Sequence, residues 1–392
     1  MATPTSSSAA DVAIIGGGVA GLAVAYLLAK EGVARVVLLE REPMLAMHAT
    51  AKNAAIFLPV ERDEVSMRLA VRQAALLDAL CEGRTWLDPR GALLVAEDPA
   101  LLAPVATAAR AGGLACAMFD RAALRDAAPL LRGGRAHAAL HVPASGVLDT
   151  GAMVAALVGS ARTGGVSIRT ARDARRIRVE RGRVVGVEFS DGALLATGSV
   201  VLAGGAWSES LAEASGLALP LVALRRHLAW LAAPPEASEV ARGPVVWAVD
   251  DEVYFRGESG GVLASPCDEQ PHPPGVHGVD ADALESLARK LGGLAPRLAD
   301  MGVRRAWSCL RTFAPDRVAV AGADPRVAGL AWLAGLGGQG MTLGVATAEL
   351  TCAAVLGTAH PLAASLGPAR LLGGDAAPRA SRVVGPAGVS AS

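Results

Sequence analysis

The stretch Asp11-Val12-Ala13-Ile14-Ile15-Gly16-Gly17-Gly18-Val19-Ala20-Gly21 decides the fold of this chain. Its first half has the apolar composition of a buried parallel strand, and its second half reads G-x-G-x-x-G. Gly16 permits a tight turn, Gly18 lets the backbone approach a pyrophosphate, and Gly21 lets the following helix pack closely on the strand. The pattern therefore predicts a strand, a turn and a helix whose N-terminal amides face phosphates.

The residues that follow fit the same motif. We expect a helix from about Val19 to Lys30 and a second buried strand, Arg35 to Leu39, that ends at Glu40. A carboxylate at this point can accept hydrogen bonds from both hydroxyls of an adenosine ribose, and it would repel a 2′-phosphate. The sequence thus predicts an α/β domain with a doubly wound parallel sheet that binds a dinucleotide.

The composition is that of a folded protein without a strong charge bias. Of 392 residues, 52% are apolar and 19% are charged, with 37 Lys plus Arg against 37 Asp plus Glu. This balance gives no argument for a nucleic-acid partner. The five cysteines show no metal-ligand spacing, so we expect free thiols in a cytoplasmic protein and no metal site. No apolar run is long enough for an integral membrane segment.

Further along the chain the pattern changes to many short strands. Residues 166–196 predict a four-stranded β-meander, and the alternation after Leu221 predicts a large antiparallel sheet in a second, α+β domain. Gly204-Gly205 ends another buried strand, and the turn from Gly335 to Gly340 opens the last long helix. Because a helix N-terminus stabilises negative charge, this last turn can hold the far end of the molecule that the first turn binds.

Four motifs together resemble one family. They are the N-terminal fingerprint with Glu40, Gly205-Ala206-Trp207-Ser208, the segment from Cys309 to Asp316, and Gly337-Gly338-Gln339-Gly340. In combination they resemble the FAD-dependent amine oxidoreductases of the D-amino-acid oxidase superfamily, which includes glycine oxidase, sarcosine oxidase and D-arginine dehydrogenase. The resemblance runs from about Asp11 to Leu356.

The resemblance implies a domain organisation. We expect a disordered leader at 1–10, a discontinuous FAD-binding domain at 11–80, 142–218 and 312–372, a substrate domain at 81–141 and 219–311, and a disordered tail at 373–392.

The resemblance also implies the cofactor contacts. The residues expected to bind FAD are Gly16, Gly18, Gly21, Glu40, Arg41, His48, Lys52, Asn53, Ala54, Gly205, Trp207, Gly337, Gly338, Gln339, Gly340 and Met341. We expect FAD to bind without a covalent bond. A covalent link through Cys309 is the alternative, because that residue matches the position where sarcosine oxidases attach their flavin.

By the same resemblance, Arg311 is the anchor for the substrate carboxylate, since its planar fork can bind both oxygens. Tyr254 would donate a hydroxyl, and Arg226 or its neighbour Arg225 would assist. The pocket positions are Ile56, Leu58, Glu61, Ala92, Val245 and Trp247. Ala92 stands where D-arginine dehydrogenase has the glutamate that holds the cationic side chain. The acidic anchor is therefore missing unless Glu61 replaces it, and an uncharged substrate is expected.

The expected reaction is FAD-dependent oxidation of the C–N bond of an amino acid, by resemblance an apolar D-amino acid, to an imino acid that water hydrolyses to a 2-oxo acid. Two alternatives stay open: oxidation of an N-substituted glycine with release of glyoxylate, and a flavin-binding electron-transfer subunit of a hetero-oligomer. We expect the electron acceptor to be oxygen or a quinone-type compound. An apolar residue near Leu263, where sarcosine oxidases have a lysine, favours a dehydrogenase.

Overall fold

The computed structural model describes residues 9–61, 63–232 and 242–373. Most of the expected leader and of the expected tail therefore lies outside the described residues. Ala10, which we assigned to the leader, is part of the fold, because it is 5% exposed and bridges to Thr197.

A six-stranded sheet forms the first layer, in the order β20-β21-β13-β1-β2-β9. All neighbours are parallel except β20 and β21. The strands are β1 (Val12–Ile15), β2 (Val36–Leu39), β9 (Ser167–Arg169), β13 (Val200–Leu202), β20 (Val320–Ala323) and β21 (Leu330–Ala334). Every residue of β1 and β2 is buried, as parallel strands covered on both faces require.

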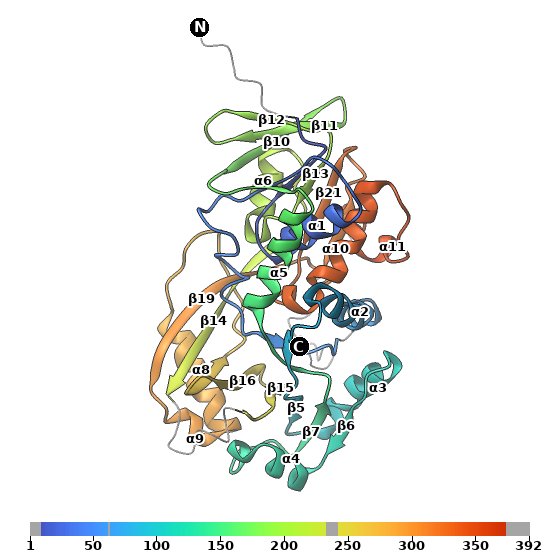
Figure 1. The fold of residues 1–392 in the computed structure, drawn as a ribbon. Coiled ribbons are helices and arrows are strands. Elements are labelled where there is room, and N and C mark those ends of the chain that lie inside the picture. The colour runs from blue at the N-terminus through green and yellow to red at the C-terminus, as the bar shows by residue number, and fades with distance from the viewer. Residues whose placement is uncertain (1–8, 62, 233–241, 374–392) are drawn as a thin grey trace.

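Helices cover one face of this sheet. They are α1 (Val19–Lys30), α2 (Glu64–Cys81), α5 (Thr150–Thr163), α10 (Gly340–Leu356) and the short α11 (Ala363–Leu366). Helix α1 packs against both α5 and α10, and α10 packs against α2 (Figure 1). Together they bury one large apolar cluster against the sheet.

The other face carries a three-stranded antiparallel sheet, β10 (Ala174–Glu180), β11 (Arg183–Phe189) and β12 (Leu194–Ala196), with α6 (Ser208–Ala214) beside it. The prediction of a four-stranded meander is therefore wrong, because this sheet contains three of the four expected strands. The first expected strand is β9, which joins the parallel sheet by pairing with β2.

A nine-stranded sheet forms the second half of the molecule, in the order β18-β14-β17-β16-β15-β5-β7-β6 with β19 on the free side of β14. Its strands are β5 (Ala92–Ala96), β6 (Ala117–Phe119), β7 (Ala138–Val142), β14 (Val222–Ala232), β15 (Val245–Ala248), β16 (Val253–Glu258), β17 (Gly261–Ser265), β18 (Gln270–Pro271) and β19 (Val303–Phe313). The sheet is antiparallel as expected, except that β5 and β15 pair in parallel.

Smaller elements complete this half. The helices are α3 (Ala103–Ala111), α4 (Arg121–Ala127), α8 (Ala281–Leu294) and α9 (Pro296–Ala299), and a small sheet contains β3 (Ile56–Phe57), β4 (Leu87–Asp88) and β8 (Gly146–Leu148). The long strands β14 and β19 lie side by side and run from this half up to the six-stranded sheet (Figure 1).

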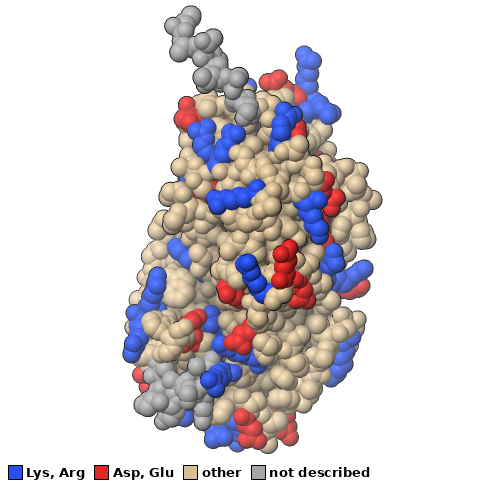
Figure 2. Space-filling model, in the orientation of Figure 1, with Lys and Arg blue, Asp and Glu red and all other residues tan. Residues whose placement is uncertain are grey.

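No single sign of charge dominates the face of the molecule seen in Figure 2. Figure 2 shows basic and acidic side chains interspersed on the face that it draws. Among the described helices, none combines the length and the apolar content that crossing a bilayer requires.

Two glycines of the first turn are required by close backbone contacts. A Cβ on Gly16, whose φ is +114°, would lie 2.3 Å from the carbonyl oxygen of Ala203. A Cβ on Gly21 would lie 1.9 Å from the carbonyl oxygen of Gly16. These contacts hold α1 and β13 tightly against the turn, as the spacing of the motif predicts.

Replacing Gly21 with alanine should therefore destabilise the fold, because α1 must move away from β1. We expect a loss on the order of 1–3 kcal/mol or more in the free energy of unfolding. The matched control is Gly159→Ala in α5, where no described atom outside the local helix lies within 4 Å of the added Cβ. This control should gain about 0.5–1 kcal/mol from helix propensity. Equal urea midpoints for the two variants would contradict the packing argument.

Candidate cofactor and substrate site

A cavity of about 320 Å³ contains both glycine-rich turns in its wall. Predicted cofactor residues make up much of this wall: Gly16, Gly18, Glu40, Arg41, His48, Lys52, Asn53, Gly205, Trp207, Gly337, Gly338, Gly340 and Met341. Gly21, Ala54 and Gln339 lie next to wall residues in sequence. The structure thus brings together segments, such as those of Gly16 and Gly340, that are more than 300 residues apart in the chain, as one elongated dinucleotide would require.

Glu40 stands at the end of β2 with its carboxylate held by two backbone amides. Oε2 accepts from Gly17 at 2.7 Å, and Oε1 accepts from Glu42 at 2.9 Å. The side chain is 8% exposed and lines the cavity. Since each carboxylate oxygen can accept more than one hydrogen bond, the fixed carboxylate can still receive the hydroxyls of a ribose.

Two helices begin at the cavity. The first amide of α1, Val19 N, donates to Thr50 Oγ1 at 3.0 Å, and α10 begins at Gly340. The two helix starts are neighbours, because a Cβ on Gly340 would lie 3.3 Å from Cγ1 of Val19. Their positive ends can therefore stabilise negative charge on a bound phosphate or on a reduced flavin.

Arg311, on β19, is buried at the cavity with an incomplete set of partners. It is 7% exposed, and its Nη2 donates to the carbonyl of Lys52 at 3.2 Å. Its Nη1 is also buried, and no described atom accepts a hydrogen bond from it. A buried charged donor without an acceptor is costly, so this nitrogen fits an anionic group that enters the cavity.

Tyr254, on β16, lies near Arg311 but outside the wall of this cavity. Burial raises the pKa of its hydroxyl to about 12, although the Arg226 and Arg311 guanidiniums oppose the shift. The hydroxyl therefore remains protonated at neutral pH and can donate a hydrogen bond. Its ring packs on that of Trp247 at a centroid distance of 4.8 Å.

Arg226 already has a carboxylate partner. Its Nη2 donates to Oε1 of Glu269 at 2.8 Å, and Arg317 forms a bidentate pair with the same carboxylate at 2.9 and 2.7 Å. The side chain of Arg226 does not reach the cavity wall described above. The structure thus places Arg226 in an ion pair between β14 and the residue just before β18, and its assistance to the substrate stays a prediction.

The loop from Thr50 to Ala55 is held by the side-chain amide of Asn53 and by residues of the nine-stranded sheet. Asn53 bonds the carbonyl of Thr50 and the amide of Ala55, both at 2.5 Å. Arg256 donates from Nε to the carbonyl of Ala54 at 2.6 Å, and Cys309 Sγ lies 3.2 Å from the carbonyl of Lys52. Sequence reasoning missed the positioning roles of Thr50 and Arg256, because hydrogen bonds between distant segments leave no pattern in the sequence.

Three predicted residues form a stack on another part of the wall. The ring of His48 lies 4.4 Å from that of Trp207, and the guanidinium of Arg41 lies 5.1 Å from the Trp207 ring centre. His48 Nε2 is 3.0 Å from Oε1 of Glu42. These side chains can form an aromatic and cationic surface for the nucleotide.

The predicted pocket residues gather in a second, apolar region. Ile56, Leu58, Ala92, Val245 and Trp247 all belong to one apolar cluster, in which Ala92 and Val245 are paired on neighbouring strands. None of them lines the cavity that holds the glycine turns.

Glu61 is the buried carboxyl group beside this cluster. It is 6% exposed, and it accepts a hydrogen bond from the side chain of Gln339, the residue just before α10. Burial raises the pKa of Glu61 to about 8, although the hydrogen bond from Gln339 opposes the shift. Glu61 is therefore mostly protonated at neutral pH.

The residues present fit FAD as a ligand. The fixed carboxylate suits the adenosine ribose, the two helix starts suit the negative groups, and the unpartnered nitrogen of Arg311 suits an anion at the second glycine turn. These groups lie in the wall of one cavity or point toward it.

Comparison with known proteins gives the same assignment. Residues 11–354 match the family model described as FAD dependent oxidoreductase. The chain is 27% identical to the pyruvate dehydrogenase phosphatase regulatory subunit of Mus musculus, over 86% of this chain and 40% of that protein. It is 31% identical to a D-amino acid dehydrogenase of Cereibacter sphaeroides, over 71% of this chain and 63% of that protein.

Among solved structures, L-proline dehydrogenase from P. horikoshii has the same fold, with a TM-score of 0.83 at 19% identity. The alignment covers 92% of this chain and 97% of that one. The chain spans less than two thirds of the two curated relatives, so their similarity concerns part of each protein. The match to the family model covers most of this chain, and the chain belongs to the FAD-dependent oxidoreductase family.

Proposed function

We propose that the chain oxidises the C–N bond of an amino acid and that its substrate is an apolar D-amino acid. The observation that carries the proposal is the buried Nη1 of Arg311, which has no acceptor among the described residues. An α-carboxylate would supply that acceptor. Bound FAD would supply the hydride acceptor for oxidation at the α-carbon of the substrate.

The protein groups would orient the substrate. Arg311 would bind the carboxylate through its fork, while the carbonyl of Lys52 holds Nη2 and so fixes the plane of the guanidinium. The protonated hydroxyl of Tyr254 would donate to the same carboxylate. Because two groups would define the position of the carboxylate, the α-carbon would be held in one place for hydride transfer.

The apolar cluster supports an uncharged side chain. Leu58, Ala92 and Val245 are 6% exposed or less and carry no charge to pair with a cation. Glu61, the carboxyl group beside them, is mostly neutral near pH 7 because of its raised pKa. A guanidinium in this region would lose its hydration without gaining a fixed anion, so arginine would be a poor substrate. The D configuration is supported by the relative that is named a D-amino acid dehydrogenase.

One comparison favours a second candidate function. The relative matched over 86% of this chain is named a regulatory subunit, so this fold also occurs in a protein that is not named as an enzyme. Under this alternative the chain would hold FAD within a hetero-oligomer and show no turnover alone. An N-substituted glycine remains the alternative substrate, and its oxidation would release glyoxylate.

The decisive experiment is anaerobic reduction of the purified yellow protein by single substrates. We expect apolar D-amino acids to bleach the flavin bands, and L-enantiomers and D-arginine to leave them unchanged over the same time. Bleaching by N-alkyl glycines with release of glyoxylate would favour the alternative substrate class. No bleaching by any amine, together with recovery of a stoichiometric partner from the native host, would overturn the proposal. Readmission of air then distinguishes an oxidase from an enzyme that needs a quinone-type acceptor.

Arg311→Met should weaken substrate recognition while FAD stays bound. Loss of a buried charged hydrogen-bond donor should cost on the order of 2–5 kcal/mol in kcat/KM, mostly through KM. The matched control is Arg304→Ala, which removes an exposed arginine from the same strand and should leave kcat/KM unchanged. An unchanged KM in Arg311→Met with full flavin content would remove Arg311 from the site.

Glu61→Gln should change how stability depends on pH. The pKa of Glu61 is about 8 in the folded protein and 4.5 is its ordinary value, so the folded state binds this proton more tightly. The stabilisation that the folded state gains from binding this proton is fully present below pH 4.5 and is lost as pH rises toward 8. Between pH 5 and 8.5 the free energy of unfolding of the wild type should fall by a few kcal/mol relative to that of Glu61→Gln, at about 1.4 kcal/mol per pKa unit. Urea unfolding in excess FAD measures these free energies. If the wild type and Glu61→Gln differ by the same amount at pH 5 and pH 8.5, the raised pKa of Glu61 is contradicted.

A further inference from the structure

A loop from the nine-stranded sheet reaches the cavity. Gly275 and His277 belong to the cavity wall, although they lie between β18 and α8 in the other half of the molecule. Ser308 and Cys309 on β19 line the same cavity. No motif marked this loop in the sequence, since it is an irregular run of proline, glycine and histidine.

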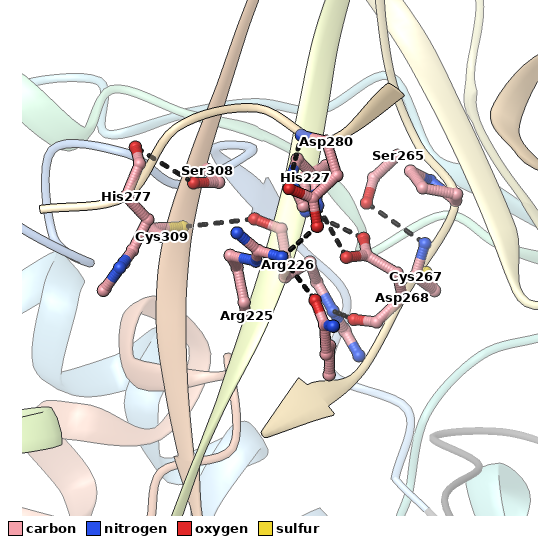
Figure 3. A network of polar contacts seen from close by, with 12 residues as sticks. Arg225, Arg226, His227, Ser265, Cys267, Asp268, His277, Asp280, Ser308 and Cys309 are labelled. Carbon is pink, nitrogen blue, oxygen red and sulfur yellow. Dashed lines mark hydrogen bonds and ion pairs between the residues drawn. The ribbon is translucent and has the colours of Figure 1, made fainter. Parts of the chain in front are cut away.

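The two long strands hold the loop in place. Ser308 Oγ donates to the carbonyl of Gly278 at 2.8 Å, and Arg225 pairs with the carboxylate of Asp280 (Figure 3). His227 Nε2 accepts from the amide of Asp280 at 3.1 Å. The loop is thus tied at its far end to β14 and in its middle to β19.

The hydrogen bond from the amide of Asp280 to His227 requires a neutral imidazole. Because Nε2 accepts the amide hydrogen of Asp280, the ring proton lies on Nδ1, which donates to Oδ2 of Asp268 at 2.6 Å. His227 is 1% exposed, and its backbone amide donates to the same carboxylate of Asp268 at 2.8 Å. The position of Asp280 is therefore set by a buried group that cannot rotate freely.

His277 lies at the cavity with a buried and unused ring nitrogen. Its carbonyl faces Ser308, and its side chain extends away from Arg225 and Asp280 (Figure 3). Nε2 is buried, and no described atom forms a hydrogen bond with it. A buried polar atom of this kind costs free energy until a partner is supplied.

The groups around His277 favour a ligand with acceptor oxygens. Burial, followed by the charges of His272, Arg225, Lys52 and His48, lowers the pKa of His277. The ring is therefore neutral near pH 7 and can present one N–H, in surroundings that favour negative charge. FAD offers such acceptors in its phosphates, its ribityl hydroxyls and its ring carbonyls.

We propose that His277 donates a hydrogen bond from Nε2 to bound FAD, and that the segment 272–280 is a strap held over the cofactor by Arg225, His227 and Ser308. This inference requires that the chain binds FAD, as its family does, and it does not depend on the proposed reaction. It assigns a cofactor-holding role to a part of the chain that lies outside both glycine-rich turns.

The test is the rate of FAD release from the holoprotein, followed by the rise in flavin fluorescence after dilution. His277→Ala should speed release about tenfold, the loss expected for one buried hydrogen bond. His277→Gln keeps an N–H donor and should stay within about threefold of the wild type. The matched control is Val276→Ala, which alters the same loop at a side chain that is 87% exposed and should leave the rate unchanged.

The strap is tested by a double-mutant cycle. Asp280→Asn weakens the pair with Arg225 and should also speed FAD release, but it should add little once His277→Ala is present. Additive effects would overturn the strap. An unchanged rate in His277→Ala, or an equal loss in His277→Gln and His277→Ala, would overturn the hydrogen bond. If His277→Ala does not accumulate as folded protein, the comparison of His277→Gln with His277→Leu decides the same question.

Discussion

The contact on which the site depends is the one between the end of β19 and the second glycine turn. The amide of Gly337 donates to the carbonyl of Thr312 at 2.9 Å. A Cβ on Gly337 would lie 2.8 Å from Phe313, and one on Gly338 would lie 3.2 Å from Cδ of Arg311. Both glycines have positive φ, at 56° and 90°. Only residues without a side chain let the start of α10 come this close to the arginine.

Arg311 and Arg226 show why the partners of a charge, and not its burial, indicate its role. The two residues lie on neighbouring strands and are 7% and 6% exposed. Arg226 is paired with Glu269, which it shares with Arg317, whereas one nitrogen of Arg311 has no described acceptor. A buried charge that is paired within the protein helps to fix the arrangement of strands and loops, whereas a buried charged donor without an acceptor favours binding of a ligand. The sequence alone does not distinguish them, because both are arginines in strand-like segments.

Local patterns predicted the elements that depend on local physics. The first turn, α1, β2, Glu40 and α10 lie where the glycine spacing and the apolar periodicity placed them. Pairing between distant segments was harder to predict. The join of β9 to β2 and the parallel pair of β5 with β15 depend on tertiary contacts that short-range alternation does not encode. His277 was missed for a related reason, since only the tie between its loop and β14 brings it to the cavity.

The order of strands in the six-stranded sheet has a consequence for how the protein folds. β1 lies between β2 and β13, and β13 pairs on its other edge with β21. Ala13 is paired with Val200, and Val200 with Leu330. Contacts between such distant segments require closure of long loops before they stabilise the chain, which makes folding slow. During synthesis β1 therefore keeps one edge unpaired until β13, at Val200–Leu202, has left the ribosome, and β13 in turn keeps an edge unpaired until β21, at Leu330–Ala334, follows. The unpaired apolar edges make this nascent stage open to aggregation, and the flavin site is incomplete until the second glycine turn, with Gly337 and Gly338, has been made.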